Sequence, residues 1–419
     1  MLSYRKLAMR VLGRPLHTEG IDSPRPASQR AAAFILTAAM LTTLAAPAFA
    51  DIWHIENGDI TISAGESGNN VTQNNNTTYG DTNTIITNQN KDTASSHTVT
   101  IEAKDKDDKV EVTLKDVNID TSSRNKAAVS VTGEGDTNIK LDGDNALKSD
   151  IYRSGIYGSG SLTISGGEND SLTAQGGSGA NGISSSGSLT ISGGTVTANG
   201  DDGGRGISSS GSVTISGGST VTANGGSGTI SGGDGIWSGG GVTISGGSTV
   251  TANGGNGGSL VGGDGIRSGG GLTVSDGTVT AKGGNGDSKD GYGGDGIRSG
   301  GVVTISGNTV NAAGGYGGKV GGYGICSFDR VAISGGTVEA AGGNGSTGGG
   351  SGIYSSVIDL SGSLELTAKA GSPNGKALSQ KGSELVLDTI KDKLGPGAKV
   401  TATDADGKVI DQVSTPRPV

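Results

Sequence analysis

A repeated segment of 24 to 31 residues is the feature of this sequence that most limits its possible folds. Its consensus is Gly-Ile-x-Ser-x-Gly-x-(Val/Leu)-Thr-(Ile/Val)-Ser-Gly-Gly-x-Val-Thr-Ala-x-Gly-Gly, followed by a glycine-rich loop. The isoleucines that follow a glycine stand at positions 156, 183, 207, 236, 266, 297, 325 and 353. The distance from each isoleucine to the alanine of Val-Thr-Ala stays at 15 to 18 residues, whereas the loop varies from 9 to 16. Units too short to bury an apolar face alone predict a stack of similar units.

Three short strands are expected in each repeat. Residues 190–192 (Thr-Ile-Ser) and 195–197 (Thr-Val-Thr) alternate polar and apolar side chains, and Ile183 adds a third apolar position. Such alternation is typical of a strand with one buried face, and the Gly-Gly and Ser-Gly steps between the segments permit backbone corners. We therefore predict an all-β fold, a single-stranded right-handed parallel β-helix with coils of 24–31 residues.

A β-propeller and a disordered chain are the competing interpretations. Propeller blades need four strands in roughly 40–50 residues, which these units are too short to supply. Glycine makes up 83 of the 419 residues and aromatic residues only 3%, a composition that would by itself fit disorder. A random glycine-rich chain would not keep a nearly constant isoleucine-to-alanine spacing, so the repeat favours the solenoid.

The first 50 residues are expected to be a secretory signal peptide. Six basic residues in 1–30 precede an apolar run at 31–45, and Ala48-Phe49-Ala50 supplies a small-x-small cleavage pattern. The alternative, a membrane anchor, would need about 20 apolar residues. We therefore expect a secreted or cell-surface location and no membrane insertion after signal cleavage.

The rest of the chain divides into three parts. Residues 51–150 are more charged and less regular, and we interpret them as irregular N-terminal coils or a cap, with 73–78 as a loop. Residues 151–370 carry the glycine-rich repeats. An open β-helix needs its last coil covered, so 371–419 are expected to form a C-terminal cap or tail, with a strand at 383–387.

Charge and cysteine content exclude several classes of function. Residues 1–50 hold six basic and two acidic side chains, so the remainder has 25 basic and 38 acidic ones, a formal net charge of −13. Nucleic-acid binding needs a surplus of Lys and Arg, so we expect no nucleic-acid partner. As a separate expectation, the protein is a monomer. Cys326 is the single cysteine, so neither an intramolecular disulfide nor a cysteine-based zinc site can form.

Several segments resemble a known family. Residues 118–120 (Asn-Ile-Asp), 143–147 (Gly-Asp-Asn-Ala-Leu) and 160–167 (Gly-Ser-Leu-Thr-Ile-Ser-Gly-Gly), with the Gly-Gly-Thr-Val-Thr-Ala units after them, are similar to one family of secreted bacterial proteins. It is the carbohydrate-binding domain family with a pectate-lyase-like right-handed parallel β-helix. The likeness covers most of 52–370 and implies polysaccharide binding outside the cell, with bound calcium. No ligand residue is carried over, because no short binding signature matches.

Stacked coils would turn one position of the repeat into a row of side chains about 4.8 Å apart. The residue before each Gly-Ile pair gives such a row, with Asp234, Asp264 and Asp295 as consecutive members. Carboxylates at that spacing repel one another, and Ca²⁺ would offset the repulsion. A calcium site at these residues is therefore one hypothesis. Hydrogen bonds to the glycine-rich turn, or ion pairs with Arg267 and Arg298, are the structural alternatives.

The residue after each isoleucine gives a second row, expected to point outward. Trp237, Arg267 and Arg298 are consecutive members, and Tyr292 lies in a long loop nearby. An aromatic ring stacks on the C–H face of a sugar, while guanidinium groups bind hydroxyls or a uronate carboxylate. We predict that these four residues bind carbohydrate. The alternative is that Trp237 is an exposed surface residue that binds no ligand.

An exported, non-catalytic polysaccharide-binding protein is the function predicted from these features. A surface adhesin or structural spacer, and a pectate-lyase-like polysaccharide lyase, are the alternatives. Three histidines leave little material for a Ser-His-Asp triad or a metallohydrolase, so we expect no catalytic residue and no enzyme activity.

Overall fold

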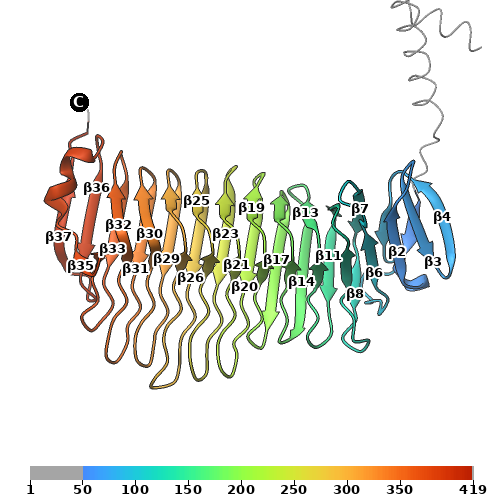
Figure 1. Ribbon diagram of the computed structural model, residues 1–419, viewed down its shortest axis with the longest axis horizontal. Coiled ribbons are helices and arrows are strands. Elements are labelled where there is room, and N and C mark those ends of the chain that lie inside the picture. The colour runs from blue at the N-terminus through green and yellow to red at the C-terminus, as the bar shows by residue number, and fades with distance from the viewer. Residues whose placement is uncertain (1–50, 418–419) are drawn as a thin grey trace, which may run out of the picture. The chain divides into compact units, whose positions relative to one another are not determined.

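The computed structural model describes residues 51–417 and confirms the predicted parallel β-solenoid. It has about 11 turns of about 28 residues each, with 50% strand and 3% helix. Figure 1 shows the coils side by side along one axis, in an order that follows the chain. The predicted signal peptide, residues 1–50, lies outside the described residues. Within 51–417 no helix is long and apolar enough to cross a membrane.

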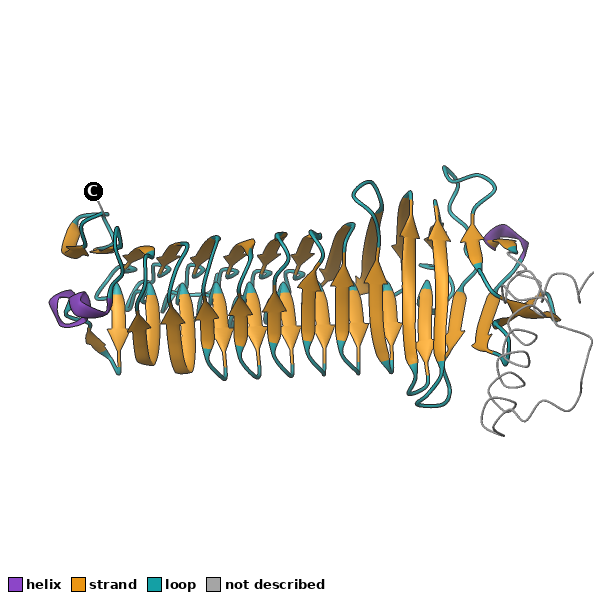
Figure 2. Ribbon diagram, turned by 90° about the horizontal axis from the view of Figure 1, so that it is seen from above, coloured by secondary structure: helices purple, strands orange, loops and turns teal. Residues whose placement is uncertain are grey.

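Each regular coil contains three strands, as the repeat predicts, and the strands form two sheets (Figure 2). The first strands are β12 (Ile156–Gly158), β15 (Ile183–Ser185), β18 (Ile207–Ser209), β21 (Ile236–Ser238), β24 (Ile266–Ser268), β27 (Ile297–Ser299) and β34 (Leu378–Gln380). The second strands are β13 (Ser161–Ser165), β16 (Leu189–Ser192), β19 (Val213–Ser216), β22 (Val242–Ile244), β25 (Leu272–Val274) and β28 (Val303–Ile305). First and second strands merge in β30 (Ile325–Ile333) and β32 (Ile353–Leu360).

The third strands form the second sheet, which has 12 strands among the described residues. They are β8 (Asn118–Asp120), β11 (Asp144–Lys148), β14 (Ser171–Ser178), β17 (Thr195–Asp201), β20 (Thr220–Asn224), β23 (Ser248–Asn253), β26 (Gly277–Lys282), β29 (Thr309–Ala313), β31 (Thr337–Ala341), β33 (Glu365–Lys369) and β36 (Lys399–Thr403), with β37 (Val409–Ser414) at the edge. From β8 to β36 every neighbouring pair is parallel, so each coil repeats the path of the one before it.

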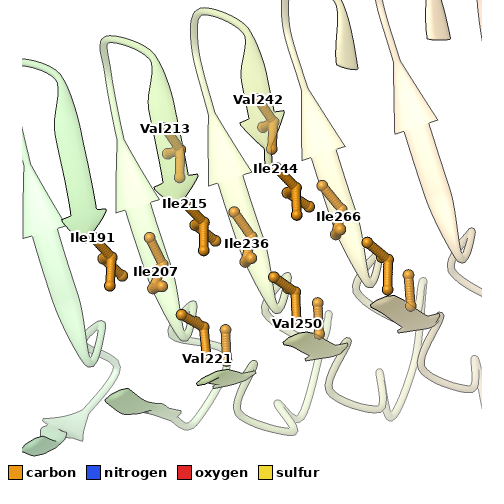
Figure 3. Packing of buried hydrophobic residues seen from close by; sticks show 14 of the residues in the cluster. Ile191, Ile207, Val213, Ile215, Val221, Ile236, Val242, Ile244, Val250 and Ile266 are labelled. Atoms are coloured by element: carbon orange, nitrogen blue, oxygen red, sulfur yellow. The ribbon is translucent and has the colours of Figure 1, made fainter. Parts of the chain in front are cut away.

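The core consists of aliphatic columns that run through the stack (Figure 3). Ile236 pairs in register with Ile266, which pairs in register with Ile297, and all three are 0% exposed. The third strands add a valine column, in which Val221 lies beside Val250. Removal of these side chains from water is the main favourable contribution to folding, and each coil completes the burial of its neighbour.

A column of serines points into the same core, which the sequence pattern did not predict. Ser238, Ser268 and Ser299 are at most 2% exposed. Ser238 donates its hydroxyl hydrogen to the carbonyl oxygen of Gly211, at 2.8 Å, and Ser299 donates to that of Gly270, also at 2.8 Å. The bonds cross from coil to coil and satisfy polar groups that would otherwise be buried without a partner.

The glycine-rich loops between third and first strands also stack in rows. The amide of Gly255 donates to the carbonyl of Gly233 at 2.8 Å, and the amide of Gly233 donates to Gly226 at 2.9 Å. A Cβ atom on Gly233 would overlap the carbonyl oxygen of Gly204 in the preceding coil. Glycine is thus required at position 233 because the backbones of neighbouring coils approach closely. At Gly217 the reason is the predicted one, a backbone corner, since its φ is +68°.

Residues 51–150 contain earlier coils of the same solenoid and an antiparallel hairpin. The strands are β1 (Ile52–His54), β2 (Ile60–Ala64), β3 (Asn69–Gln73), β4 (Asn76–Asp81), β5 (Ile85–Thr87), β6 (Val99–Glu102), β7 (Lys109–Lys115), β9 (Val129–Thr132) and β10 (Asp136–Asp142), with a 3-10 turn η1 (Ile55–Asn57). The prediction of a loop at 73–78 was wrong, because β3 and β4 pair there. Asn74 and Asn75 both adopt positive φ, at 53° and 64°, which is the geometry of a two-residue hairpin turn.

At the C-terminal end the chain leaves the regular coil. The strand expected at 383–387 is reduced to β35 (Ser383–Glu384), and a 3-10 helix, η2 (Leu387–Lys393), follows it. Leu387 and Ile390 lie three residues apart, on one side of that helix, and both are buried. β37 then pairs antiparallel with β36 and ends the second sheet.

Candidate functional site

A groove of about 710 Å³ runs along the solenoid beside the first strands. We call it the central groove. Its lining includes six of the seven residues predicted from the sequence, which are Asp234, Asp264, Asp295, Arg267, Arg298 and Tyr292. Glycines of the stacked loops line much of the remainder, and isolated bridges from Val261 to Tyr292 and from Tyr292 to Val320 hold one wall in register.

Asp234, Asp264 and Asp295, here called the Asp ladder, hydrogen bond from one coil to the next. The Oδ1 atom of Asp234 accepts the amide hydrogen of Asp264 at 2.8 Å, and the Oδ1 atom of Asp264 accepts that of Asp295 at 2.7 Å. Asn181, in the same row, accepts the amide hydrogen of Arg205 in the same way, at 2.8 Å. The carboxylates therefore bond to the backbone of the following coil, and not to their own glycine-rich turn, which was one of the structural alternatives.

The electrostatics of the Asp ladder are dominated by burial. Each of the three residues is at most 7% exposed. Burial raises the pKa of Asp264 well above its ordinary value, and the neighbouring carboxylates of Asp295 and Asp234 raise it further. Burial also raises the pKa of Asp234 and of Asp295, although arginines next to them act in the opposite direction.

The arginines beside the Asp ladder differ in whether they form an ion pair with its carboxylates. Arg298 Nε lies 2.8 Å from Asp295 Oδ2 and 3.7 Å from Asp264 Oδ2, and Arg205 Nε lies 3.4 Å from Asp234 Oδ2. Arg267 is exposed and makes no ion pair within 4.0 Å among residues 51–417. The predicted ion pair thus forms with Arg298 and not with Arg267. The guanidinium of Arg267 still acts on the ladder at longer range, because it opposes the rise that burial causes in the pKa of Asp234 and of Asp295.

The donor set of the Asp ladder does not fit a calcium ion. One oxygen of each carboxylate is bound to a backbone amide, and the second faces an arginine at Asp234, Asp264 and Asp295. In the part of the chain that the structure describes, no group of three or more His, Cys, Asp or Glu side chains could hold a metal ion. The calcium site expected from the sequence is thus disfavoured by the arrangement of its oxygens and is tested below by the response of the unfolding midpoint to calcium, and the proposed function does not depend on it.

The aromatic side chains are arranged differently from the sequence prediction. Trp237 is half-buried and does not line the central groove, and the guanidinium carbon of Arg205 lies 4.4 Å from the centre of its ring. One face of the tryptophan is therefore covered by a cation. Tyr292 does line the groove, is 45% exposed, and has Lys319 Nζ at 5.6 Å from its ring centre.

Two groove residues were missed as site residues. Arg205 occupies the same row as the Asp ladder, directly before Gly206-Ile207, so its position in the repeat carried the signal. Tyr323 continues that row and stacks on Tyr354, with ring centres 4.8 Å apart and planes at 16°. The outward row is also not uniformly exposed, because Cys326 is 1% exposed, and burial raises the pKa of its thiol to about 12.

Comparison with protein-family models, curated proteins and solved structures finds no match to this chain. The resemblance described from the sequence is therefore supported for the β-helix fold alone.

Proposed function

We propose that this protein binds an extended polysaccharide in the central groove, without catalysis and outside the cell. The observation that carries the proposal is a groove across several coils that is lined by an exposed arginine without an ion pair and by an exposed tyrosine ring. Arg267 makes no ion pair within 4.0 Å among the described residues, and Tyr292, which lines the same groove, is 45% exposed. Sugar recognition uses these two groups, a ring for the C–H face and a guanidinium for oxygen atoms.

Acidic sugars fit this groove better than neutral ones. A guanidinium binds a carboxylate through two parallel hydrogen bonds, which are stronger than bonds to a hydroxyl. Arg205 and Arg298 each have an acidic partner within 4.0 Å, whereas Arg267 has none among the described residues and is the most exposed to a ligand of the three. We therefore propose a uronate-containing chain as the ligand and Arg267 as its main contact.

The test is isothermal titration of the protein with polygalacturonate and alginate, and with dextran as the neutral control. Binding of the acidic polymers should weaken as salt is added, because the contact is charged. Arg267→Gln should reduce affinity by roughly 10- to 100-fold, since a hydrogen bond to a charged group contributes about 1.5–3 kcal/mol. Arg330→Gln, which removes an exposed arginine outside the central groove, should leave affinity unchanged.

Absence of binding to every acidic and neutral polysaccharide would contradict the proposal and favour the adhesin or spacer function instead. The lyase alternative predicts an ultraviolet-absorbing unsaturated product from polygalacturonate, and we expect none. Although burial lowers the pKa of Arg298, the carboxylates of Asp295 and Asp264 raise it to a net value above that of a free guanidinium. That side chain therefore stays protonated and is a poor base for proton abstraction.

A further inference from the structure

A second hollow, of about 660 Å³, adjoins the central groove on its N-terminal side. Gly179 and Asn181 line both, so the two hollows meet at these residues. We call it the N-terminal hollow. Its lining includes Tyr152, Arg153 and Tyr157, none of which belongs to the site predicted from the sequence.

Tyr152 occupies a backbone position that disfavours tyrosine. The residue four places before the aligned aliphatic side chain has a positive φ in four successive coils, and the residues are Asn125 (53°), Tyr152 (58°), Gly179 (74°) and Gly203 (82°). Asparagine and glycine tolerate this left-handed conformation, whereas a bulky residue is strained in it. Such strain is found where the surroundings or a function require the residue.

The hydrophobic gain from burying the ring does not offset this backbone strain, because the side chain of Tyr152 is 77% exposed. The ring lies over the next coil, since a Cβ atom on Gly179 would come within 2.9 Å of it. The aromatic surface is therefore presented at the junction of the two hollows. Tyr157, 44% exposed, supplies a second ring in the same hollow.

Positive charge accompanies the two rings. Lys126 and Arg153 occupy equivalent positions of successive coils, each three residues before the aligned Val129 and Ile156. Lys126 Nζ is paired with Asp59 Oδ2 at 3.4 Å. Arg153 is exposed and its side chain bonds only to a neutral amide oxygen at 3.4 Å, with no ion pair within 4.0 Å in residues 51–417. The N-terminal hollow thus repeats the chemistry of the central groove, a guanidinium without an ion pair beside exposed aromatic rings.

We propose that the N-terminal hollow is a second subsite for the same acidic polysaccharide, with Tyr152 and Tyr157 stacking on sugars and Arg153 binding a carboxylate. This inference rests on the proposed function. Tyr157 and Arg267 belong to one outward row, four coils apart, which is roughly 19 Å at about 4.8 Å per coil. One or two sugars cannot span that distance, so the ligand is a chain of several sugars.

Chain length is the variable that tests the inference. Size-fractionated oligogalacturonates, from the disaccharide to chains of about twenty sugars, are titrated into the protein. Engagement of a second subsite makes the second contact intramolecular, so long chains should bind on the order of 100-fold more tightly than short ones. The affinity per chain is divided by the number of overlapping binding positions that a chain of that length offers, so that this statistical gain is corrected for.

The variant for this test is Tyr152→Asn combined with Tyr157→Ser. Both replacements occur naturally in the same columns, as Asn125 at the left-handed position and Ser184 in the outward row, so the coil should fold normally. The double variant should lower the affinity for long chains to that of short chains. Tyr79→Ser, which removes a tyrosine that is 73% exposed on β4, is the matched control and should not alter it.

The outcomes separate this inference from the proposed function. Equal affinity for short and long chains, or a double variant that binds long chains as the unmodified protein does, overturns the second subsite while the central groove stands. Loss of affinity in Arg267→Gln together with no length dependence likewise overturns the second subsite alone. Failure of every oligogalacturonate to bind overturns the proposed function, and the second subsite with it.

Discussion

At the scale of single residues, the Asp ladder shows how a repeated carboxylate can serve the stack itself. Its oxygen atoms accept amide hydrogens of the following coil, and Asn181 performs the same task without charge. The hydrogen bond therefore needs the oxygen and not the negative charge. The charge adds repulsion between neighbours about 4.8 Å apart, in surroundings where water screens it poorly.

The substitution Asp264→Asn should raise stability at neutral pH. Below the ordinary pKa of 3.8, the carboxyl is protonated in the folded and unfolded states alike. Between 3.8 and the raised folded pKa, only the folded state keeps the proton, so stability falls as pH rises through that window. Asparagine does not titrate and carries no charge, so it removes both this pH-dependent loss of stability and the repulsion from Asp234 and Asp295. The free energy of unfolding should rise by roughly 1–3 kcal/mol at pH 7.

Chemical denaturation at a series of pH values measures this effect. The unmodified protein should lose stability from about pH 4 upward, and Asp264→Asn should show a flatter profile. The control is Asp264→Ala, which leaves the amide of Asp295 without its acceptor and should cost about 1–3 kcal/mol. Equal profiles for the aspartate and asparagine proteins would contradict a raised pKa at this position.

Added calcium should leave the thermal unfolding midpoint unchanged, and so should a chelator. The physical reason is that amides and arginines already occupy the oxygens of the Asp ladder. Differential scanning fluorimetry with millimolar calcium or with chelator measures this directly. A midpoint that rises with calcium in the unmodified protein, but not in Asp264→Asn, would place an ion at the ladder after all.

At the scale of the element, the glycine-rich loops are ordered rows with their own hydrogen bonds. The amide of Gly350 donates to the carbonyl of Gly343 at 2.8 Å, and the amide of Gly343 donates to Gly322 at 2.8 Å. These rows hold the loop wall that carries Tyr292 and Val320. The shape of the central groove therefore depends on glycine at positions far from any ligand contact.

Two alanine substitutions in one loop test this dependence. A Cβ atom at Gly350 would overlap the carbonyl oxygen of Gly322, so Gly350→Ala should destabilise the protein by about 1–3 kcal/mol. Gly348→Ala is the matched control, because its Cβ atom would meet only methyl groups of Val320, at 3.6 Å. Urea denaturation of both variants measures the difference, and equal stabilities would show that the loop backbones can separate at little cost.

At the scale of the whole molecule, a stack of coils must be closed at its ends. Within the solenoid each strand pairs with the strands of the two adjacent coils. A strand of the last coil has such a neighbour on one side only, so its other edge needs a different partner. At the C-terminal end β37 pairs antiparallel with β36, and η2 buries Leu387 and Ile390 beside it. These elements replace the next coil.

Truncation after Thr403, which removes β37, should therefore make the protein self-associate. The open edge of β36 would expose unpaired amides and carbonyls to a second molecule. Light scattering coupled to size-exclusion chromatography should give a monomer for the full protein and concentration-dependent oligomers for the truncated one. A truncated protein that stays monomeric at all concentrations would show that β36 needs no cover.

The sequence by itself determined the stack. Side chains alternate with a period of two within the strands, and the isoleucine-to-alanine distance is nearly fixed. Only one register of the coils then buries Ile236, Ile266 and Ile297 together, and the structure has that register. Six of the seven candidate residues that it singled out line the central groove, because stacking converts equal positions in the repeat into neighbours. These are local and periodic properties, which a linear pattern can express.

Only the tertiary structure decided what those neighbours do. That Arg205 covers Trp237, that Arg298 is ion-paired and Arg267 is not, and that two hollows meet at Gly179 all depend on side-chain directions and loop paths. The loops differ in length and carry no alternating pattern, so their course is fixed by backbone hydrogen bonds between coils. Contacts of that kind exist only after the coils have stacked.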